Sequence, residues 1–231
     1  MSGNRVGPSL PPGPGKVFYP MFVDIEGRRA LVVGGGPVAT EKVEKLLDHG
    51  AAVRLVSPDL TPELREMVRD GRIHELHERT YEPSDLDGCF MVIAATNLDA
   101  VNRMIWQDAE ALNILCNVVD VPPMCNFIVP SIVRRGELAI AISTGGASPV
   151  VAKHIRRDLE ATYGPEWEAL VDLLREVRDE LKVRYLDMPS RRVAVERLME
   201  TDVVQRLAAG DEDGARELAR AVLDIEREVR A

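Results

Sequence analysis

The sequence has few aromatic residues and few cysteines. Aromatic residues make up 4% of its 231 positions and the net charge is −9, and both values argue against nucleic acid as a partner. The cysteines, Cys89, Cys116 and Cys125, form no Cys-x-x-Cys pair. An odd number without paired spacing predicts free thiols in a reducing cytoplasm. We expect Cys89 and Cys116 to pack in the core, whereas the position of Cys125 close to Asp120 leaves its role open.

Long apolar runs are also missing. No stretch approaches the ~20 apolar residues that a membrane-spanning helix needs, so we expect no membrane partner. Residues 1–16 are rich in Gly and Pro and predict a disordered tail, neither a signal peptide nor an anchor. No set of Cys, His and carboxylate residues has the spacing of a structural metal site. Hydrophobic residues still amount to 45% of the chain, which is enough for a sizeable core.

What the chain does contain is an alternation of short apolar strands with helices. Strands and helices in this alternation are typical of βαβ units, in which the strands form a parallel sheet. The fold class predicted for residues 17–116 is therefore α/β, a Rossmann-like NAD-binding domain. The strands are expected at 30–33, 53–56, 73–77, 90–95 and 114–119, and the helices at 38–49, 62–69 and 99–112.

The pattern changes in residues 117–163. Two β-like runs predict a hairpin, and Ser148-Pro149 predicts the start of a long helix. This segment is too small to form a hydrophobic core of its own, so we expect it to pack against a second subunit in a homodimer. We also expect it to carry part of the active site. The hairpin strands and their turn are expected at 127–133, 138–143 and 134–137.

The rest of the chain, residues 164–231, is expected to form a helical C-terminal domain. Pro189 should break the first helix, which begins near Glu166, and further helices should follow at 192–207 and 214–229. One apolar stripe is expected on the first helix, because apolar residues recur at spacings of four, three and four: Leu170, Leu174, Val177 and Leu181.

A glycine-rich turn follows the first strand and precedes the first helix. Its pattern, Gly34-x-Gly36-x-x-Ala39, is typical of dinucleotide-binding turns in this context. Gly34 permits a tight turn, Gly36 lets the backbone approach a pyrophosphate, and Ala39 allows close packing of helix on strand. The N-terminus of the helix attracts the anion. We favour a dinucleotide site over a glycine turn without a ligand.

Two further strand ends are candidates for the same cofactor. Pro58-Asp59 follows the second strand, and a carboxylate about 20 residues beyond the glycines commonly binds the ribose hydroxyls. No Arg follows directly to bind a 2′-phosphate, which favours NAD over NADP. Thr96-Asn97 follows a third strand at the same edge of the sheet. These two residues either line the nicotinamide half of the site or cap the next helix.

Asp120 is the predicted catalytic residue. It follows an apolar strand, at the end where open α/β folds place their ligands. Hydride transfer to NAD⁺ usually requires loss of a proton as well, which a carboxylate in a partly buried cleft could accept. An aspartate in a turn ahead of Pro122-Pro123 explains the same residue without catalysis, so both interpretations stay open.

A glycine turn and a basic cluster in the middle segment are candidates for substrate binding. Gly145-Gly146, ahead of the helix capped by Ser148, could expose N–H groups to a carboxylate or phosphate, or could form an ordinary turn. Basic residues crowd the same segment against one acid, Glu137, which suggests a polyanionic small ligand as the alternative to a solvated face. They are Arg134, Arg135, Lys153, His154, Arg156 and Arg157.

Four stretches of the sequence together resemble the precorrin-2 dehydrogenase/sirohydrochlorin ferrochelatase family, the N-terminal module of siroheme synthases. They are YPMFV at 19–23, VVGGGPVATEK at 32–42, NVVDVPPMCNFIVPSIV at 117–133 and STGGASPVVA at 143–152. The resemblance implies NAD⁺-dependent oxidation of precorrin-2, a tetrapyrrole, to sirohydrochlorin. It also implies a homodimer whose middle segments interlock around the active site.

The resemblance implies roles for single residues as well. Asp120 corresponds to the family's catalytic aspartate, and Pro37-Val38 and Pro58-Asp59 correspond to positions that contact NAD. Ser148 corresponds to a serine near the tetrapyrrole that can be phosphorylated in a longer relative. The carboxylates of the tetrapyrrole would account for the basic cluster around Lys153.

Two alternatives remain beside the dehydrogenase. Some family members also insert Fe²⁺ into sirohydrochlorin, and no residue here distinguishes such a bifunctional enzyme. A NAD-sensing regulatory module would need the glycine turn but neither Asp120 nor the basic cluster. The methyltransferase domain of siroheme synthases is absent from these 231 residues, so we expect a separate protein to make precorrin-2.

Overall fold

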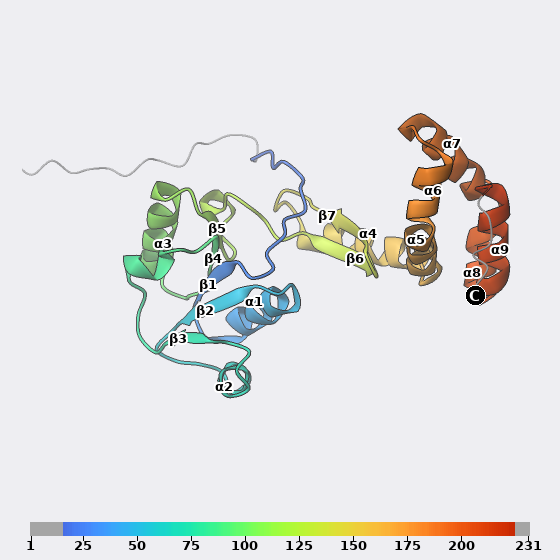
Figure 1. Cartoon of the computed structure of the whole chain (residues 1–231). Helices are drawn as coiled ribbons and strands as arrows, with labels where there is room; N and C mark the ends of the chain where they lie inside the picture. The colour runs from blue at the N-terminus through green and yellow to red at the C-terminus, as the bar shows by residue number, and fades with distance from the viewer. Residues whose placement is uncertain (1–15, 225–231) are drawn as a thin grey trace, which may run out of the picture. The chain divides into compact units, whose positions relative to one another are not determined.

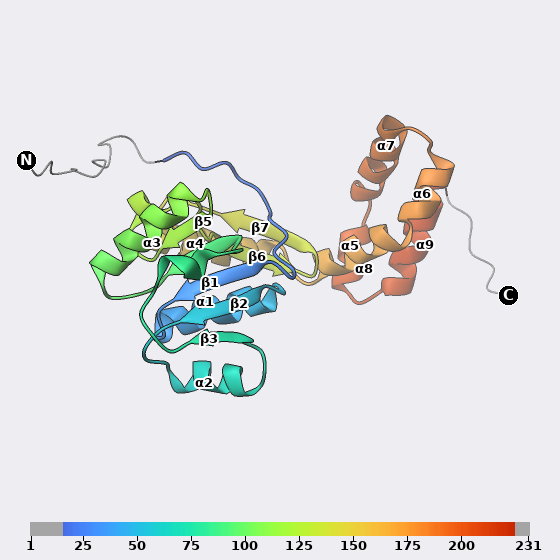
Figure 2. The same cartoon turned by 60° about the vertical axis from the view of Figure 1, so that its left-hand side comes forward.

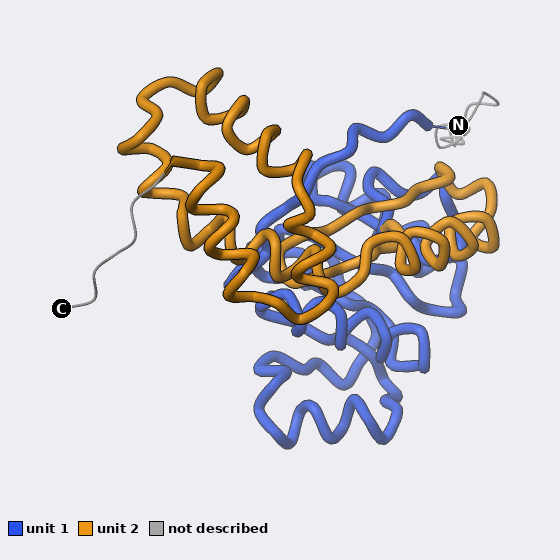
Figure 3. Tube along the Cα trace, turned by 90° about the vertical axis from the view of Figure 1, so that its right-hand side faces the viewer, with its two compact units in different colours: residues 1–129 blue, residues 130–231 orange. Residues whose placement is uncertain are grey.

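The structure is a computed structural model that describes residues 16–224. The chain divides into two compact units, residues 1–129 and 130–231 (Figure 3), and each is described by itself. The tail predicted at residues 1–16 falls, except for its last residue, outside the described residues. Among residues 16–224, no helix is long and apolar enough to cross a membrane.

The first unit is built on a five-stranded parallel sheet with strand order β3-β2-β1-β4-β5 (Figures 1 and 2). This arrangement confirms the Rossmann-like α/β fold. The strands are β1 (Arg29–Val33), β2 (Ala52–Val56), β3 (Glu75–His77), β4 (Met91–Ala94) and β5 (Leu115–Val118). The helices are α1 (Pro37–Asp48), α2 (Pro62–Arg69) and α3 (Asp99–Ala111), with short 3₁₀ turns η1 (Pro83–Leu86) and η2 (Pro122–Met124).

Both faces of this sheet are buried, and its central strands β1 and β4 are apolar at consecutive positions. Ala30 and Val32 of β1 belong to the apolar cluster formed with α1 and α2. Leu31 and Val33 belong to the cluster on the opposite face, formed with α3. Successive side chains of a strand point to opposite faces, so a strand covered on both sides needs a continuous apolar run.

The carboxyl ends of the five strands lie in one row. Val33 of β1 pairs with Val56 of β2 and with Ala94 of β4. In the same register, β3 ends at His77 and β5 at Val118. Residues just beyond these ends emerge along one edge of the sheet, which is where open α/β folds bind their ligands.

Hydrogen bonds tie the loop after β5 back to that strand. The N–H of Cys116 donates to Asn126 Oδ1 at 2.7 Å, and the Asn126 N–H donates to the Cys116 carbonyl at 3.0 Å. Asn117 Nδ2 donates to the carbonyl of Phe127 at 3.1 Å. The loop therefore stays with the first unit, and the boundary at 129/130 lies beyond the one that the sequence pattern suggests at residue 116.

The second unit combines a hairpin with helices. The antiparallel hairpin consists of β6 (Ser131–Arg135) and β7 (Leu138–Ile142), and α4 (Pro149–Thr162) packs against it. The helices that follow pack against one another (Figure 1), and their buried residues form a separate apolar core. They are α5 (Glu166–Glu176), α6 (Arg178–Arg184), α7 (Met188–Met199), α8 (Val203–Ala208) and α9 (Glu212–Val222).

Several element boundaries in the second unit differ from the sequence expectation. The first hairpin strand begins at Ser131, because the preceding residues remain tied to β5. Arg134 and Arg135 lie within β6, where they pair with β7, and not in the turn. Pro189 lies in the first turn of α7 and starts that helix, as proline does where a helix needs no N–H. The expected helix at 192–207 is divided between α7 and α8.

The apolar stripe also has a break. The first helix ends at Glu176, and Val177 has backbone angles of φ −89° and ψ 2° before α6 begins. The stripe also contains Leu173, which is buried at 4% exposure, whereas Leu174 is only partly buried. The expected final helix ends at Val222, and its last expected residues lie outside the described part of the chain.

Candidate active site

A cleft of about 580 Å³ opens at the carboxyl edge of the parallel sheet. Its wall includes segments that follow four strands: the glycine turn after β1, residues 57–61 after β2, residues 79–81 after β3 and residues 95–98 after β4. The volume lies within the range of small-molecule sites. All eight residues predicted to contact the cofactor line this one cleft: Gly34, Gly36, Pro37, Val38, Pro58, Asp59, Thr96 and Asn97.

Close packing of backbone on backbone requires two glycines of the turn. Gly34 has a φ of 124°, and a Cβ at this position would overlap the carbonyl of Ala95 at the end of β4. A Cβ at Gly35 would overlap the Asp59 carbonyl and lie 2.8 Å from Ser57 Oγ. The sequence interpretation gave Gly35 no role, because its contact comes from a segment that is distant in the chain.

Gly36 differs from both of these glycines. Its backbone is extended (φ −83°, ψ −177°), and a Cβ would meet no atom within 4 Å. Gly36 is the N-cap of α1, whose first turn receives no side-chain hydrogen bond. Pro37 has no N–H, so Val38 and Ala39 supply the N–H groups that begin this helix without an intrahelical acceptor. Open space in front of a helix N-terminus fits the pyrophosphate of a dinucleotide.

The residues after β2 and β4 are held in place by local hydrogen bonds. Ser57 Oγ donates to the Asp59 carbonyl at 2.7 Å, and the Asp59 side chain is exposed at the cleft. Thr96 lies where the sequence placed it, at the end of β4 and just ahead of α3. It lines the cleft, and its Oγ1 accepts from the N–H of Leu98, the N-cap of α3, at 3.2 Å.

The sequence interpretation missed the segment after β3. Arg79 lines the cleft and binds Asp85 through two hydrogen bonds of 2.8 and 2.9 Å. Burial works to raise the pKa of Asp85, whose side chain is 1% exposed, but hydrogen bonds from Arg79 and from the Glu82 N–H hold that pKa below its usual range. A signal was available, because in a parallel sheet the residues after the third strand must emerge at the ligand edge.

Asp120 lies at the same edge of the sheet but is not on the wall of this cleft. It follows β5 by two residues and is exposed, although the sequence interpretation expected a partly buried carboxylate. Its φ of 59° is left-handed, a conformation that aspartate adopts more readily than most residues. Neighbouring strands are about 4.8 Å apart, so Asp120 lies about one strand spacing from Thr96 and two from the glycine turn.

The glycine turn predicted to bind substrate lies in the second unit, ahead of α4. Gly145 and Gly146 have φ values of 62° and 87°. Ser148 caps α4, because its Oγ accepts from the N–H of Val151 at 3.3 Å. Thr144 Oγ1 in turn accepts from the Ser148 N–H at 3.1 Å. The capping role that the sequence offered as one alternative for Ser148 is therefore present.

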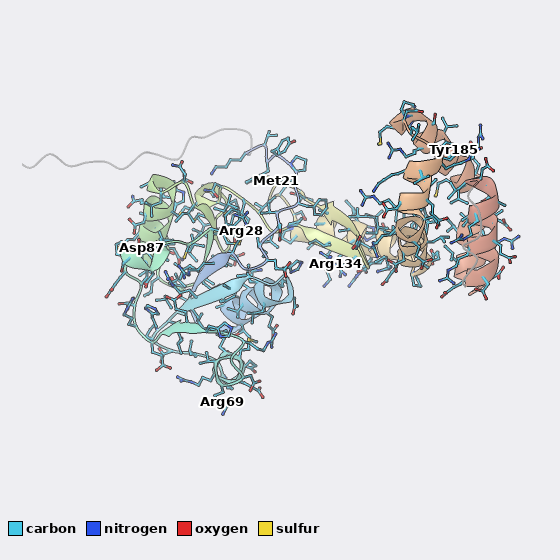
Figure 4. The ribbon with its side chains drawn as sticks, in the orientation of Figure 1. Met21, Arg28, Arg69, Asp87, Arg134 and Tyr185 are labelled. Carbon is cyan, nitrogen blue, oxygen red and sulfur yellow. The ribbon has the colours of Figure 1, made fainter. Side chains whose placement is uncertain are left out.

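The basic cluster of the second unit is partly neutralised. Arg156 forms an ion pair with Glu160, one turn along α4. His154 Nε2 lies 3.5 Å from Asp158 Oδ2 on the same helix. Lys153 is exposed on α4, and Arg134 is exposed on β6 (Figure 4). The local positive charge is thus smaller than the composition of the segment suggests.

All three cysteines are buried free thiols. The Cys125 thiol contacts the carbonyls of Val118 and Val121 at 3.3 and 3.4 Å. Burial raises the pKa of Cys125, and raises that of Cys116 to about 12. Cys125, whose role the sequence left open, holds the turn that carries Asp120. Within residues 16–224, no group of three or more His, Cys, Asp or Glu side chains could hold a metal ion.

Three family models match the chain in order. An NAD(P)-binding model covers residues 21–131, the central region of a sirohaem biosynthesis protein covers 135–162, and a sirohaem synthase dimerisation region covers 166–223.

Curated relatives and solved structures are similar to this chain. Siroheme synthases of Pseudomonas entomophila (strain L48) and Methylobacillus flagellatus are each 40% identical, over 90% and 88% of this chain. The chain spans only 44% of the length of each of these relatives. A solved structure of SirC, precorrin-2 dehydrogenase, is 27% identical with a TM-score of 0.72 and covers 90% of this chain and 100% of its own.

Proposed function

This chain belongs to the siroheme-synthase family, and we propose that it oxidises precorrin-2 to sirohydrochlorin with NAD⁺ as the hydride acceptor. The observation that carries the proposal is the cleft of the first unit, where all eight residues expected to contact a dinucleotide meet. Gly36 and the N-terminus of α1 would hold the pyrophosphate, and Asp59 would bind the ribose hydroxyls of the adenosine half. When bound, NAD⁺ supplies the acceptor for the hydride.

Asp120 is the residue to which we assign the proton. The substrate must lose a proton as well as a hydride in this oxidation, and a positioned carboxylate can accept it. Hydrogen bonds of Asn117 and Asn126 fix the loop that carries Asp120, so the backbone that presents the carboxylate is held in place before the substrate arrives. Its exposure leaves it open to a substrate as large as a tetrapyrrole.

The turn and the cations of the second unit suit the carboxylates of the substrate. Gly145 and Gly146 turn the backbone ahead of a helix N-terminus, where N–H groups favour anions. Ser148, Lys153, Arg156 and Arg134 complete the set that we assign to substrate binding. Arg156 would have to exchange Glu160 for a substrate carboxylate, so we expect a smaller contribution from it than from Lys153.

We also propose that the chain acts as a homodimer. A two-stranded hairpin needs further cover for its apolar residues to be stable in water, and Ala152 is the buried residue that α4 contributes. Val150 and Val151 of this helix are 77% and 48% exposed. Light scattering should give twice the mass of one chain at micromolar concentration, and a monomer under those conditions would contradict the proposal.

The direct test is formation of NADH when precorrin-2 and NAD⁺ are added to the protein without oxygen. Asp120→Asn is the matched variant, because asparagine also adopts the left-handed conformation. We expect unchanged NAD⁺ affinity and a fall in turnover of about 100- to 10,000-fold, the range that general-base catalysis supplies. Turnover of Asp120→Asn at the wild-type rate would remove Asp120 from the mechanism.

Two outcomes of this assay separate the alternatives. A protein that binds NAD⁺ but oxidises no tetrapyrrole would be a sensor and not a dehydrogenase. For the second activity, sirohydrochlorin is incubated without oxygen with Fe²⁺ or Co²⁺. A rate of metal insertion above the spontaneous rate would identify a bifunctional enzyme.

A further inference from the structure

The segment after β3 contributes a charged side chain to the cofactor cleft. Among the residues that line this cleft in the described part of the chain, the charged ones are Asp59 and Arg79. Arg79 follows β3 by two residues, and β3 is the strand next to β2 at one end of the sheet. Asp120 follows β5, at the opposite end. With the pyrophosphate at the central strand β1 and the nicotinamide toward Asp120, the adenosine half must extend over β2 and β3.

Most N–H groups of the Arg79 guanidinium already have hydrogen-bond partners within the protein. Nη1 donates to the Thr80 carbonyl and to Asp85 Oδ2, both at 2.9 Å. Nη2 donates to Asp85 Oδ1 and contacts His77 Nδ1, both at 2.8 Å. A guanidinium has five N–H donors and no acceptor, so His77 Nδ1 must accept here. Four of the five donors are thus engaged, and what remains for a ligand is mainly the flat face of the group.

A flat guanidinium face is a good surface for a nucleobase. Bases stack on the planes of arginine side chains as they do on aromatic rings. The Arg79 side chain is 34% exposed, so part of it is available to a ligand in the cleft. The hydrogen bonds to Asp85 and Thr80 hold the plane in one orientation before the ligand arrives.

Because of the same contacts, Arg79 is not available to bind a phosphate. The carboxylate of Asp85 is 1% exposed and also accepts from the Glu82 N–H at 2.8 Å, so it is fixed and neutralises the guanidinium. A 2′-phosphate on the ribose would meet the carboxylate of Asp59 and find the donors of Arg79 occupied. Arginine binds phosphate through parallel N–H donors, and those donors already point at Asp85.

We infer that Arg79 is the residue on which the adenine of the cofactor stacks, and that Asp85, by occupying its donors, makes the cleft selective for NAD over NADP. The inference rests on the proposed function only in taking a nicotinamide dinucleotide as the ligand. Its tests are binding measurements, so they are independent of precorrin-2 oxidation.

The first test separates the two halves of the cofactor. Calorimetry measures the affinity of the full chain for NAD⁺, AMP and nicotinamide mononucleotide. Arg79→Lys keeps a cation beside Asp85 but loses the flat face, so we expect NAD⁺ and AMP to bind about 5- to 100-fold more weakly, as base stacking predicts, and the mononucleotide to bind unchanged. Arg65→Lys is the control, because Arg65 forms an exposed ion pair with Glu78 at 3.0 Å and does not line the cleft.

Two results of this test would overturn the assignment to adenine. One is wild-type affinity of Arg79→Lys for AMP, and the other is an equal loss for all three ligands, which a general distortion of the cleft would cause. If Arg79→Lys does not fold by a thermal scan, the double variant Arg79→Met/Asp85→Asn takes its place, because it leaves no unpaired buried charge. Absence of NAD⁺ binding by the unchanged chain would instead refute the cofactor of the proposed function.

The second test concerns the phosphate. Asp59→Ser removes the repelling carboxylate, and adding Asp85→Asn frees the donors of Arg79. We expect the ratio of NADP⁺ to NAD⁺ affinity to rise at least 10-fold further in the double variant than in Asp59→Ser alone. No further gain from Asp85→Asn, in a variant that still folds and binds AMP, would show that Asp85 does not set the selectivity.

Discussion

Gly36 offers the sharpest test of where the cofactor lies, because the three consecutive glycines, Gly34, Gly35 and Gly36, have different reasons to be glycine. Gly36 has backbone angles that any residue adopts and empty space where a side chain would be. We therefore expect Gly36→Ala to leave the free energy of unfolding within about 1 kcal/mol of the wild-type value. Gly34→Ala combines a φ of 124° with overlap on the Ala95 carbonyl, and should cost about 3 kcal/mol or more.

The effect of Gly36→Ala should be on cofactor binding. A methyl group at this position would fill the space through which the pyrophosphate reaches the N-terminus of α1. Loss of one charge-assisted hydrogen bond is worth about 1.5–3 kcal/mol, which corresponds to a fall in NAD⁺ affinity of about 10- to 150-fold. Gly36→Asp adds a negative charge to the same space and should abolish binding.

The assay pairs two measurements on each variant: denaturant unfolding for stability and calorimetry for NAD⁺ affinity. The reasoning requires that Gly36→Ala lose affinity without losing stability, and that Gly34→Ala lose stability first. Normal NAD⁺ affinity in Gly36→Ala, and above all in Gly36→Asp, would refute the placement of the pyrophosphate against this turn.

Three further predictions concern groups with unusual environments. Asp120→Gly should be at least as stable as the wild type, because glycine adopts a φ of 59° without strain, and denaturant unfolding checks this. Its turnover in the NADH assay should fall as in Asp120→Asn. Cys116 should not react with a thiol reagent at pH 8 in the native protein, because burial raises its pKa to about 12; rapid labelling would contradict its burial. The pKa of Asp85 is lowered in the folded protein, so its contribution to the free energy of unfolding is complete above the ordinary aspartate pKa of 3.8 and is lost as the pH falls through the lowered pKa. The difference in free energy of unfolding between wild type and Asp85→Asn should therefore become smaller in acid. A difference that does not change with pH would contradict this.

The sequence predicted the first unit well because each signal there is local. The consecutive apolar residues of 30–33 indicate a strand that is buried on both faces, and 53–56 has the same pattern apart from Arg54. The structure has the two runs in adjacent strands. A glycine turn between a strand and a helix has the same meaning wherever it occurs. The second unit was predicted less well, because the starts of β6 and α7 depend on contacts of Phe127 with β5 and on the position of Pro189 within its helix.

In the candidate site too, features with a local sequence signal were predicted, and features that depend on distant contacts were not. The eight residues proposed to contact the cofactor follow strands that the sequence identifies, so their meeting in one cleft could be predicted. The roles of Gly35 and Arg79 could not, because they depend on the Asp59 carbonyl and the buried Asp85, which lie elsewhere in the chain. The left-handed backbone of Asp120 was also invisible in the sequence, since aspartate occurs in many turns without it.

The register of the sheet gives the order of these residues in space, which neither the motifs nor the composition reveals. Because the strand ends lie in one row, the residues two positions beyond them follow the strand order across the edge: Arg79, Pro58, Gly35, Thr96 and Asp120. Adjacent strands are about 4.8 Å apart, so this row extends over about 19 Å.

A dinucleotide with its pyrophosphate at the central glycine turn can lie along this row in two directions. The acid Asp59 and the flat, neutralised guanidinium of Arg79 are on the side of β2 and β3, and they suit a ribose and an adenine. The exposed carboxylate of Asp120 is on the side of β5 and suits a reacting substrate. If Asp120 accepts the proton as proposed, adenine must lie over β3, because only this direction brings the nicotinamide and Asp120 to the same substrate. The reverse direction would separate the nicotinamide from Asp120 by the width of the sheet.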